Sequence, residues 1–296
     1  NNHEGKELCE FGQMVDEGAV AFSDNENPIE NSQFLRYALE YCKMYDIPVI
    51  NYSRDTEMTL GGVVNESIIS TKLGLKGMPD ISEAIIVFRD LMIAEKVKGK
   101  IHLATISTKK TTDIIKDFKK RGVRVTAEVT PHHIFFNENA ISSYNTNAKV
   151  YPPFRSEEDR RGMINAIKNK VITCISSDHN PHSSEDKEKD IKHAPFGIIG
   201  LESAFSASCT ELVKNKVDIF DIIKLFTSGP REVLNLDIPS IEIGNIANLT
   251  IISPNKDWTF SDSDIYSKSK NSIMSGVKFK GKIELTVSEK NAFGYF

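Results

Sequence analysis

The stretch "KIHLATISTKKTTDIIKDFKKRGVRVTAEVTP", Lys100 to Pro131, contains two apolar runs separated by a segment with helical spacing of its apolar residues. Each run is short and rich in β-branched residues, which is typical of a buried strand. A strand, a helix and a second strand in this order predict two parallel strands joined by a right-handed crossover. This unit therefore indicates an α/β fold.

The same alternation continues over most of the chain. Further strands are expected at 19–24, 47–53 and 171–178, and helices at 31–46, 81–99 and 156–170. The last of these helices opens with Ser156 followed by three acidic residues, which is a typical N-terminal signature. From about Ile238 onward the helical spacing vanishes and short β-like runs alternate with Gly and Asn turns. We predict a (β/α) barrel at 1–237 and a small β-domain at 238–296.

The length of 296 residues suits a single α/β barrel with a small additional domain. The apolar runs are, however, fewer than the eight strands that a closed barrel needs. The chain also begins inside a helix-like segment without an initiator Met. We therefore expect the first strands of the barrel to be absent from this chain.

Bulk properties exclude several classes of partner. A formal net charge of -4 gives no electrostatic basis for binding nucleic acid or an anionic membrane. No apolar run is long enough to span a bilayer, and the first residues lack the pattern of a signal peptide. The four cysteines, scattered without CxxC spacing, are expected to be buried free thiols in a cytoplasmic protein.

Chemically useful side chains gather where the predicted strands end. In an α/β barrel the active site lies at the carboxyl ends of the strands. The residues at such positions are Asp24, Asn25, Asn51, Tyr52, Thr105, Thr130 to His133, and Asp178 to His182. Asp178 occupies the place of a catalytic base that can also bind a metal, although an aspartate there can equally cap the following turn.

The remaining candidates have structural alternatives. His102 lies inside an apolar strand, which favours a buried histidine bonded to backbone over a metal ligand. The adjacent His132 and His133 point in different directions, so structural roles are expected for both. The position of Arg155 favours a salt bridge to the acidic start of the following helix over an ion pair with a substrate carboxylate. The glycines of residues 193–202 indicate a tight turn, or else backbone N–H groups that bind substrate.

Taken in order, several motifs resemble the type I dihydroorotases of the amidohydrolase superfamily. They are "EVTPHH", "NAKVYPPFRSEEDR", "DHNPH", "APFGIIGLE" and the C-terminal "SKSKN" and "GVKFKGK". The resemblance covers essentially the whole chain and implies a (β/α)8 TIM barrel with a small β-sandwich. It also implies hydrolysis of the cyclic amide of dihydroorotate, or the reverse closure of carbamoyl aspartate, with one or two zinc ions. An HxH metal pair belongs to the section of the family's barrel that is absent here.

The resemblance places several metal ligands of the family on unsuitable residues. It puts the bridging aspartate on Asn25, whose neutral amide cannot bridge two zinc ions. The strand-5 and strand-6 histidines fall on Tyr52 and Thr105, a protonated phenol and a residue without an imidazole. Asp178 is retained as metal ligand and family base. Tyr151 replaces a substrate-contacting asparagine and would intrude on the substrate pocket.

Other substrate-binding positions are kept, namely His182, Phe196 and Gly197. From the lost ligands we expect a non-catalytic dihydroorotase-like protein of pyrimidine biosynthesis, without a cofactor. The resemblance then implies a structural partnership with aspartate carbamoyltransferase and self-association. The alternative is an active zinc dihydroorotase with a rebuilt or mononuclear site. A third reading is a metal-free binder, or an amidohydrolase with another substrate.

Overall fold

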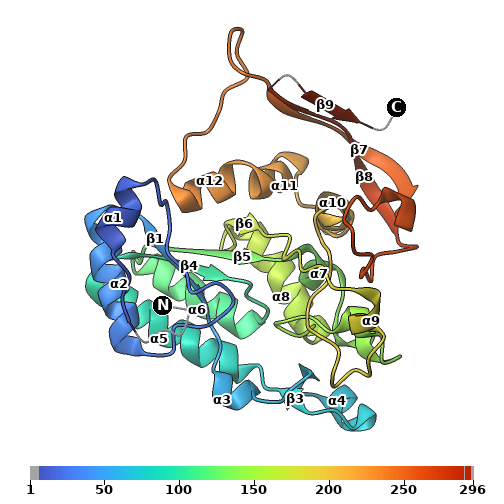
Figure 1. Ribbon diagram of the computed structural model, residues 1–296, viewed down its shortest axis with the longest axis horizontal. Coiled ribbons are helices and arrows are strands. Elements are labelled where there is room, and N and C mark those ends of the chain that lie inside the picture. Colours follow the sequence, from blue (N-terminus) through green and yellow to red (C-terminus); the bar gives the residue numbers. More distant parts are fainter. Residues whose placement is uncertain (1–6, 290, 295–296) are drawn as a thin grey trace.

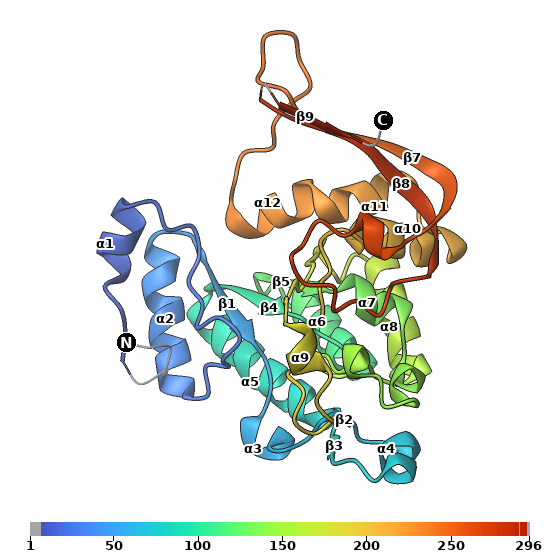
Figure 2. The same ribbon diagram turned by 45° about the vertical axis from the view of Figure 1, so that its right-hand side comes forward.

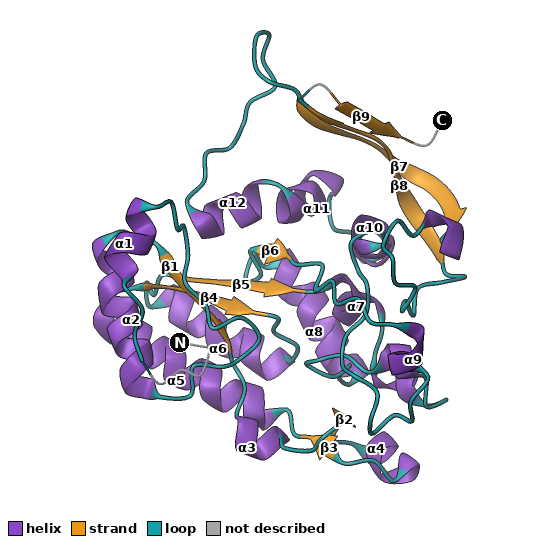
Figure 3. Ribbon diagram, viewed as in Figure 1, coloured by secondary structure: helices purple, strands orange, loops and turns teal. Residues whose placement is uncertain are grey.

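The centre of the protein is a parallel sheet with helices on both sides, seen in a computed structural model that describes residues 7–289 and 291–294 (Figures 1 and 3). Four strands lie in the order β1-β4-β5-β6 and all pair in parallel. Their bounds are Pro48–Tyr52, Lys100–Ala104, Val125–Val129 and Cys174–Ile175. Phe22 adds a single parallel bridge to Val49 at the outer edge of β1. Of the predicted strand at 19–24, only the bridge at Phe22 is found. Of the predicted strand at 171–178, only the two residues of β6 are found.

One face of the sheet is covered by four long helices (Figure 1). They are α2 (Ser32–Met44), α5 (Ile81–Val97), α6 (Lys109–Lys120) and α8 (Glu157–Lys168). The main hydrophobic core lies between these helices and the sheet, with Leu39, Leu91, Ile115 and Met163 fully buried. Ser156 caps α8 by accepting a hydrogen bond from the Asp159 N–H, which confirms the predicted start of this helix.

The opposite face is approached by the helices that follow the sheet (Figure 2). These are α10 (Ala204–Lys214), α11 (Ile219–Phe226) and α12 (Ser228–Leu234), and α11 and α12 contact β6. The segment 236–247 then runs without regular structure to the C-terminal sheet. The domain boundary near Ile238 stays a prediction.

The C-terminal part forms one antiparallel sheet of β7 (Asn248–Thr259), β8 (Lys278–Ser288) and β9 (Asn291–Gly294), with the short 3₁₀ turn η3 (Asp262–Asp264) between the first two. Only this single layer is found among the described residues, rather than both layers of the sandwich that the resemblance implies. β8 packs on α10, and the Ser206 hydroxyl donates to the Gly281 carbonyl. Gly281 has φ +88, and a Cβ there would lie 2.6 Å from the Cys209 sulfur, so only glycine allows this approach.

The loops at the carboxyl ends of the strands carry the other short elements. They are α3 (Thr56–Thr59), β2 (Val64–Asn65), α4 (Ile68–Leu73), β3 (Gly77–Met78), α7 (Pro131–Phe135), η1 (Glu138–Ile141), η2 (Thr146–Ala148) and α9 (Ser184–Lys187). Before the sheet lies α1 (Phe11–Asp16). No helix in the described part of the chain has the length and apolar composition needed to cross a membrane.

All four cysteines are free. Cys42, Cys174 and Cys209 are buried, as predicted, whereas Cys9 is exposed, because it precedes α1 at the edge of the fold.

Candidate active site

Asp178 lies just beyond the last strand of the sheet, at the carboxyl ends that the barrel geometry favours for chemistry. Its backbone has φ +45, and Thr105 and Asn25, two other strand-end positions, have φ +52 and +57. Asn and Asp tolerate this left-handed region, whereas a β-branched residue such as Thr105 is rarely found there. Of these three positions, only Thr105 therefore has a strained backbone.

Burial and two neighbouring carboxylates influence the proton affinity of Asp178. Burial raises the pKa of this carboxyl to about 7, and the negative charges of Glu26 and Glu128 raise that pKa further. Glu26 comes from the loop after residue 22 and accepts a hydrogen bond from the Asn180 amide at 3.4 Å. A concentration of negative charge in a partly buried place is favourable for a cation.

His132 is one of the strand-end candidates, for which the sequence predicts only a structural role. Its ring is buried, and its Nε2 is one of only three buried side-chain polar atoms without a hydrogen-bond partner among the described residues. This Nε2 lies 3.6 Å from Asp178 Oδ2. Burial holds the pKa of His132 well below its usual value, so the ring is neutral and can offer a lone pair.

His133, next to His132, has the structural role that was predicted for both residues. Its Nε2 is 2.9 Å from the Pro152 carbonyl and its Nδ1 is 2.6 Å from the Thr130 hydroxyl. Both ring nitrogens are therefore occupied, and burial lowers the pKa of His133 to about 4. For His132 a structural role stays a prediction, since its Nε2 has no hydrogen-bond partner and lies near Asp178.

The three positions at which the resemblance predicts replaced ligands lie around the same edge. Burial, with the charges of Glu128 and Asp178, raises the pKa of Tyr52 to about 12, so this residue is a neutral phenol. Thr105 is buried and lines one small cavity with Tyr52, whereas the exposed Asn25 lines a different cavity with it. These placements do not test whether Asn25, Tyr52 and Thr105 replace metal ligands, which stays a prediction.

Tyr151 lines a very small cavity near the carboxyl ends of the strands. The cavity that it shares with Tyr52, Arg54 and Thr105 has a volume of only ≈ 20 Å³. The Arg54 guanidinium lies 4.1 Å from the centre of the Tyr151 ring, and the Tyr151 hydroxyl donates to Thr59 Oγ1 at 3.2 Å. A ligand the size of dihydroorotate therefore requires the Tyr151 side chain to move.

His182, Phe196 and Gly197 form a closed turn. His182 Nε2 is 2.7 Å from the Phe196 carbonyl, and the Gly197 N–H donates to the Lys149 carbonyl. Gly197 has φ +110, and a Cβ there would lie 2.6 Å from Asn180. This geometry matches the tight turn, and the Gly197 N–H is not free to bind a substrate.

Arg155 and His102 each have partners other than those predicted. Arg155 is buried and donates to Ser107 Oγ, Asn65 Oδ1 and the Met78 carbonyl, so it makes neither a substrate clamp nor a salt bridge to α8. It joins the β2–β3 segment to the main sheet. His102 is bonded to side chains of the neighbouring strand rather than to backbone.

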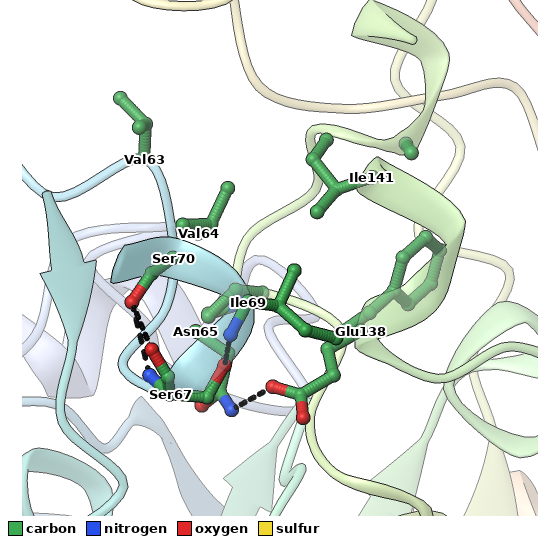
Figure 4. A pocket seen from close by; sticks show the side chains of 11 residues that line it. Val63, Val64, Asn65, Ser67, Ile69, Ser70, Glu138 and Ile141 are labelled. Carbon is green, nitrogen blue, oxygen red and sulfur yellow. Dashed lines mark hydrogen bonds between the residues drawn. The ribbon is translucent and has the colours of Figure 1, made fainter. Parts of the chain in front are cut away.

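A second small cavity in this region offers no room for a substrate. It lies between Val64, Ile69 and Ile141, and a hydrogen bond from Asn65 Nδ2 to Glu138 Oε2 at 2.6 Å closes one side (Figure 4). Its volume is ≈ 10 Å³, which is at most the space of one water molecule.

Comparison with known proteins identifies the family of this chain. The family model described as "Dihydro-orotase-like" matches residues 2–111. A dihydroorotase of Endomicrobium trichonymphae is 40% identical over 96% of this chain and 68% of its own length. The chain belongs to the dihydroorotase family. The dihydroorotase of Anaplasma phagocytophilum is 41% identical over 95% of this chain, and the chain spans 63% of that relative.

Several solved structures have the same fold as this chain. A D-hydantoinase superposes with a TM-score of 0.81 at 17% sequence identity, covering 96% of this chain and 65% of the other. The L-hydantoinase of Arthrobacter aurescens gives the same score at 18% identity, covering 96% and 67%. The TIM-barrel amidohydrolase fold expected from the sequence is thus confirmed.

The expectation of a non-catalytic dihydroorotase-like protein is contradicted by these relatives. Proteins that are 38–41% identical over 95–97% of the chain are named dihydroorotase, without qualification. The predicted replacement of single ligands does not outweigh this similarity. The expectation that no cofactor is needed loses its support for the same reason.

Proposed function

We propose that this protein is a metal-dependent dihydroorotase that hydrolyses the cyclic amide of dihydroorotate and catalyses the reverse closure of carbamoyl aspartate. The names of the relatives support the reaction. The observation that carries the proposal for this chain is the unpartnered His132 Nε2, which faces Asp178 at the strand ends. Together the two side chains offer a nitrogen and an oxygen donor to one ion.

The spacing of these donors fits a zinc ion. Zinc binds histidine nitrogen and carboxylate oxygen at about 2.0–2.2 Å, so two ligands of one ion lie within about 4.4 Å of each other. The measured separation of 3.6 Å satisfies this limit. Tyr52 and Thr105 provide neither an imidazole nor an anion. The proposed site therefore holds one zinc ion rather than two.

Asp178 has the chemistry required of the base. A bound zinc ion would supply Lewis-acid chemistry to the site. Asp178 accepts a proton from the attacking water as the new C–O bond forms at the ring carbonyl carbon. It then returns this proton to the ring nitrogen as the C–N bond breaks, so that water is consumed and the open carbamoyl amino acid is released. Ring closure follows the same path in reverse.

Arg54 and Tyr151 are proposed to control access of the substrate. In the structure described above, the Arg54 guanidinium is held over the Tyr151 ring. When this ring turns away, the cavity opens and Arg54 becomes available to pair with the carboxylate of dihydroorotate. The partnership with aspartate carbamoyltransferase and the self-association stay predictions from the resemblance.

The proposal is tested by measuring both directions of the reaction at increasing zinc concentrations, with a chelator-treated sample as the reference. Zinc-dependent loss of dihydroorotate and zinc-dependent closure of carbamoyl aspartate are expected. The variant His132→Gln should need more zinc for half-maximal rate. Absence of both reactions at every zinc concentration, in protein shown to be folded by circular dichroism, would reject the proposed function.

A further inference from the structure

Inside the sheet, three side chains with metal-binding atoms converge from neighbouring strands. His102 lies on β4, Glu128 on β5 and Cys174 at the start of β6. Glu128 pairs directly with Cys174, and His102 pairs with Thr126, two residues before Glu128 on the same side of β5. Because side chains alternate along a strand, the three residues point to the same face of the sheet.

Their donor atoms are close enough to bind one ion. One ligand atom from each residue lies within 4.8 Å of the other two. Zinc forms bonds of about 2.3 Å to thiolate sulfur and about 2.0–2.2 Å to histidine nitrogen and carboxylate oxygen. Small side-chain movements therefore suffice to bring the nitrogen, oxygen and sulfur atoms around one cation.

The hydrogen bonds of His102 prepare its ring for this role. Nδ1 lies 2.8 Å from Thr126 Oγ1, and Nε2 forms a hydrogen bond with Glu128 Oε2 at 3.2 Å that a bound ion would replace. A histidine that donates Nδ1–H to an oxygen presents the lone pair of Nε2 to a metal, and such a second partner fixes the ring of most histidine ligands. The same three residues line a cavity of ≈ 400 Å³, so an ion has a route to them.

We propose that His102, Glu128 and Cys174 form a second cation site, of the kind that takes Zn²⁺ or Co²⁺, separate from the strand-end site. It lies deeper in the fold, since His102 is three residues before the strand-end Thr105, a distance of about 10 Å along a strand. The donor set of one nitrogen, one carboxylate and one sulfur suits zinc and leaves a fourth position open. Binding converts the Cys174 thiol to a thiolate and releases its proton to solvent.

The thiolate gives this site a signature that the strand-end site lacks. Metal-free protein is titrated with Co²⁺ under anaerobic conditions while near-ultraviolet thiolate-to-cobalt charge-transfer absorption is recorded. We expect this absorption in the unaltered protein and its loss in Cys174→Ser. The matched control Cys42→Ser removes another buried thiol, in α2, and should keep the absorption.

Two further variants keep the test decisive if Cys174→Ser does not fold. Glu128→Gln and His102→Gln retain the sulfur, and each should weaken Co²⁺ binding at least 10-fold, because loss of an outer partner alone costs about 10–100-fold. Asp178→Asn should leave the absorption unchanged, so failure of the proposed catalytic site is separable from failure of this one. Absence of the absorption in the unaltered protein, its persistence in Cys174→Ser, or unchanged affinity in both glutamine variants would overturn the proposal.

Discussion

Replacing Asp178 by Asn should stabilise the metal-free protein while removing its activity. The side chain is 18% exposed, and its pKa rises from the ordinary 3.8 to about 7 on folding. The folded state therefore binds more protons than the unfolded state between these two values, and stability falls as the pH rises through this window. Asn has nearly the same shape, carries no charge and tolerates φ +45 as Asp does.

The size of the effect follows from the two pKa values. A shift of about 3 units at about 1.4 kcal/mol per unit gives a penalty on the order of 4 kcal/mol once both states are ionised, near pH 8. At about pH 5.5 roughly half of this penalty remains, and at about pH 4 less than about 1 kcal/mol. The Asn variant should gain these amounts in the free energy of unfolding.

Urea unfolding at these three pH values, with a chelator present, measures the difference directly. The urea dependence of the free energy should be unchanged, so that the midpoint alone moves. Asp190→Asn is the matched control, because His193 lowers the pKa of this exposed carboxyl and its loss should not stabilise the protein at pH 8. Equal stability of Asp178→Asn and the unaltered protein at pH 8, or a gain that does not vary with pH, would refute the reasoning.

Three further substitutions test other parts of the structure. His132→Gln should weaken zinc binding at least 10-fold in competition with a chromophoric chelator, and unchanged affinity would remove this residue from the site. Gly197→Ala places a Cβ 2.6 Å from Asn180 at φ +110 and should lower the free energy of unfolding by about 1–3 kcal/mol; an unshifted melting curve would disprove the steric argument. Arg155→Met removes buried hydrogen bonds to Ser107, Asn65 and Met78 and should lower the free energy of urea unfolding by about 1–3 kcal/mol. An unshifted unfolding midpoint would speak against the role of these bonds.

The helical part of the fold could be predicted well because its signals are local. The helix at 81–99 was expected from spacing alone, and α5 occupies Ile81–Val97. The strands at 19–24 and 171–178 were overestimated, because an apolar run shows that a segment is buried but not that it has a pairing partner along its whole length. The C-terminal sheet was expected from about Ile238, yet β7 begins only at Asn248, because the apolar residues before it are not paired.

The candidate site was predicted only in part. Asp178 could be found because its position at a strand end is a local property of the sequence. His132 is a strand-end candidate for the same reason, but its proposed ligand role could not be predicted, since that role rests on an unpartnered nitrogen near Asp178. The cluster of His102, Glu128 and Cys174 was missed similarly, because the three lie on different strands and meet only through the register of the sheet.

The most direct test of the central claim is the initial rate of dihydroorotate hydrolysis at saturating zinc, compared between the unaltered protein and Asp178→Asn. If Asp178 is the base of an active dihydroorotase, the variant should be folded and slower by about 10²–10⁴-fold. Equal rates in the two proteins, or no hydrolysis by the unaltered protein, would contradict the account.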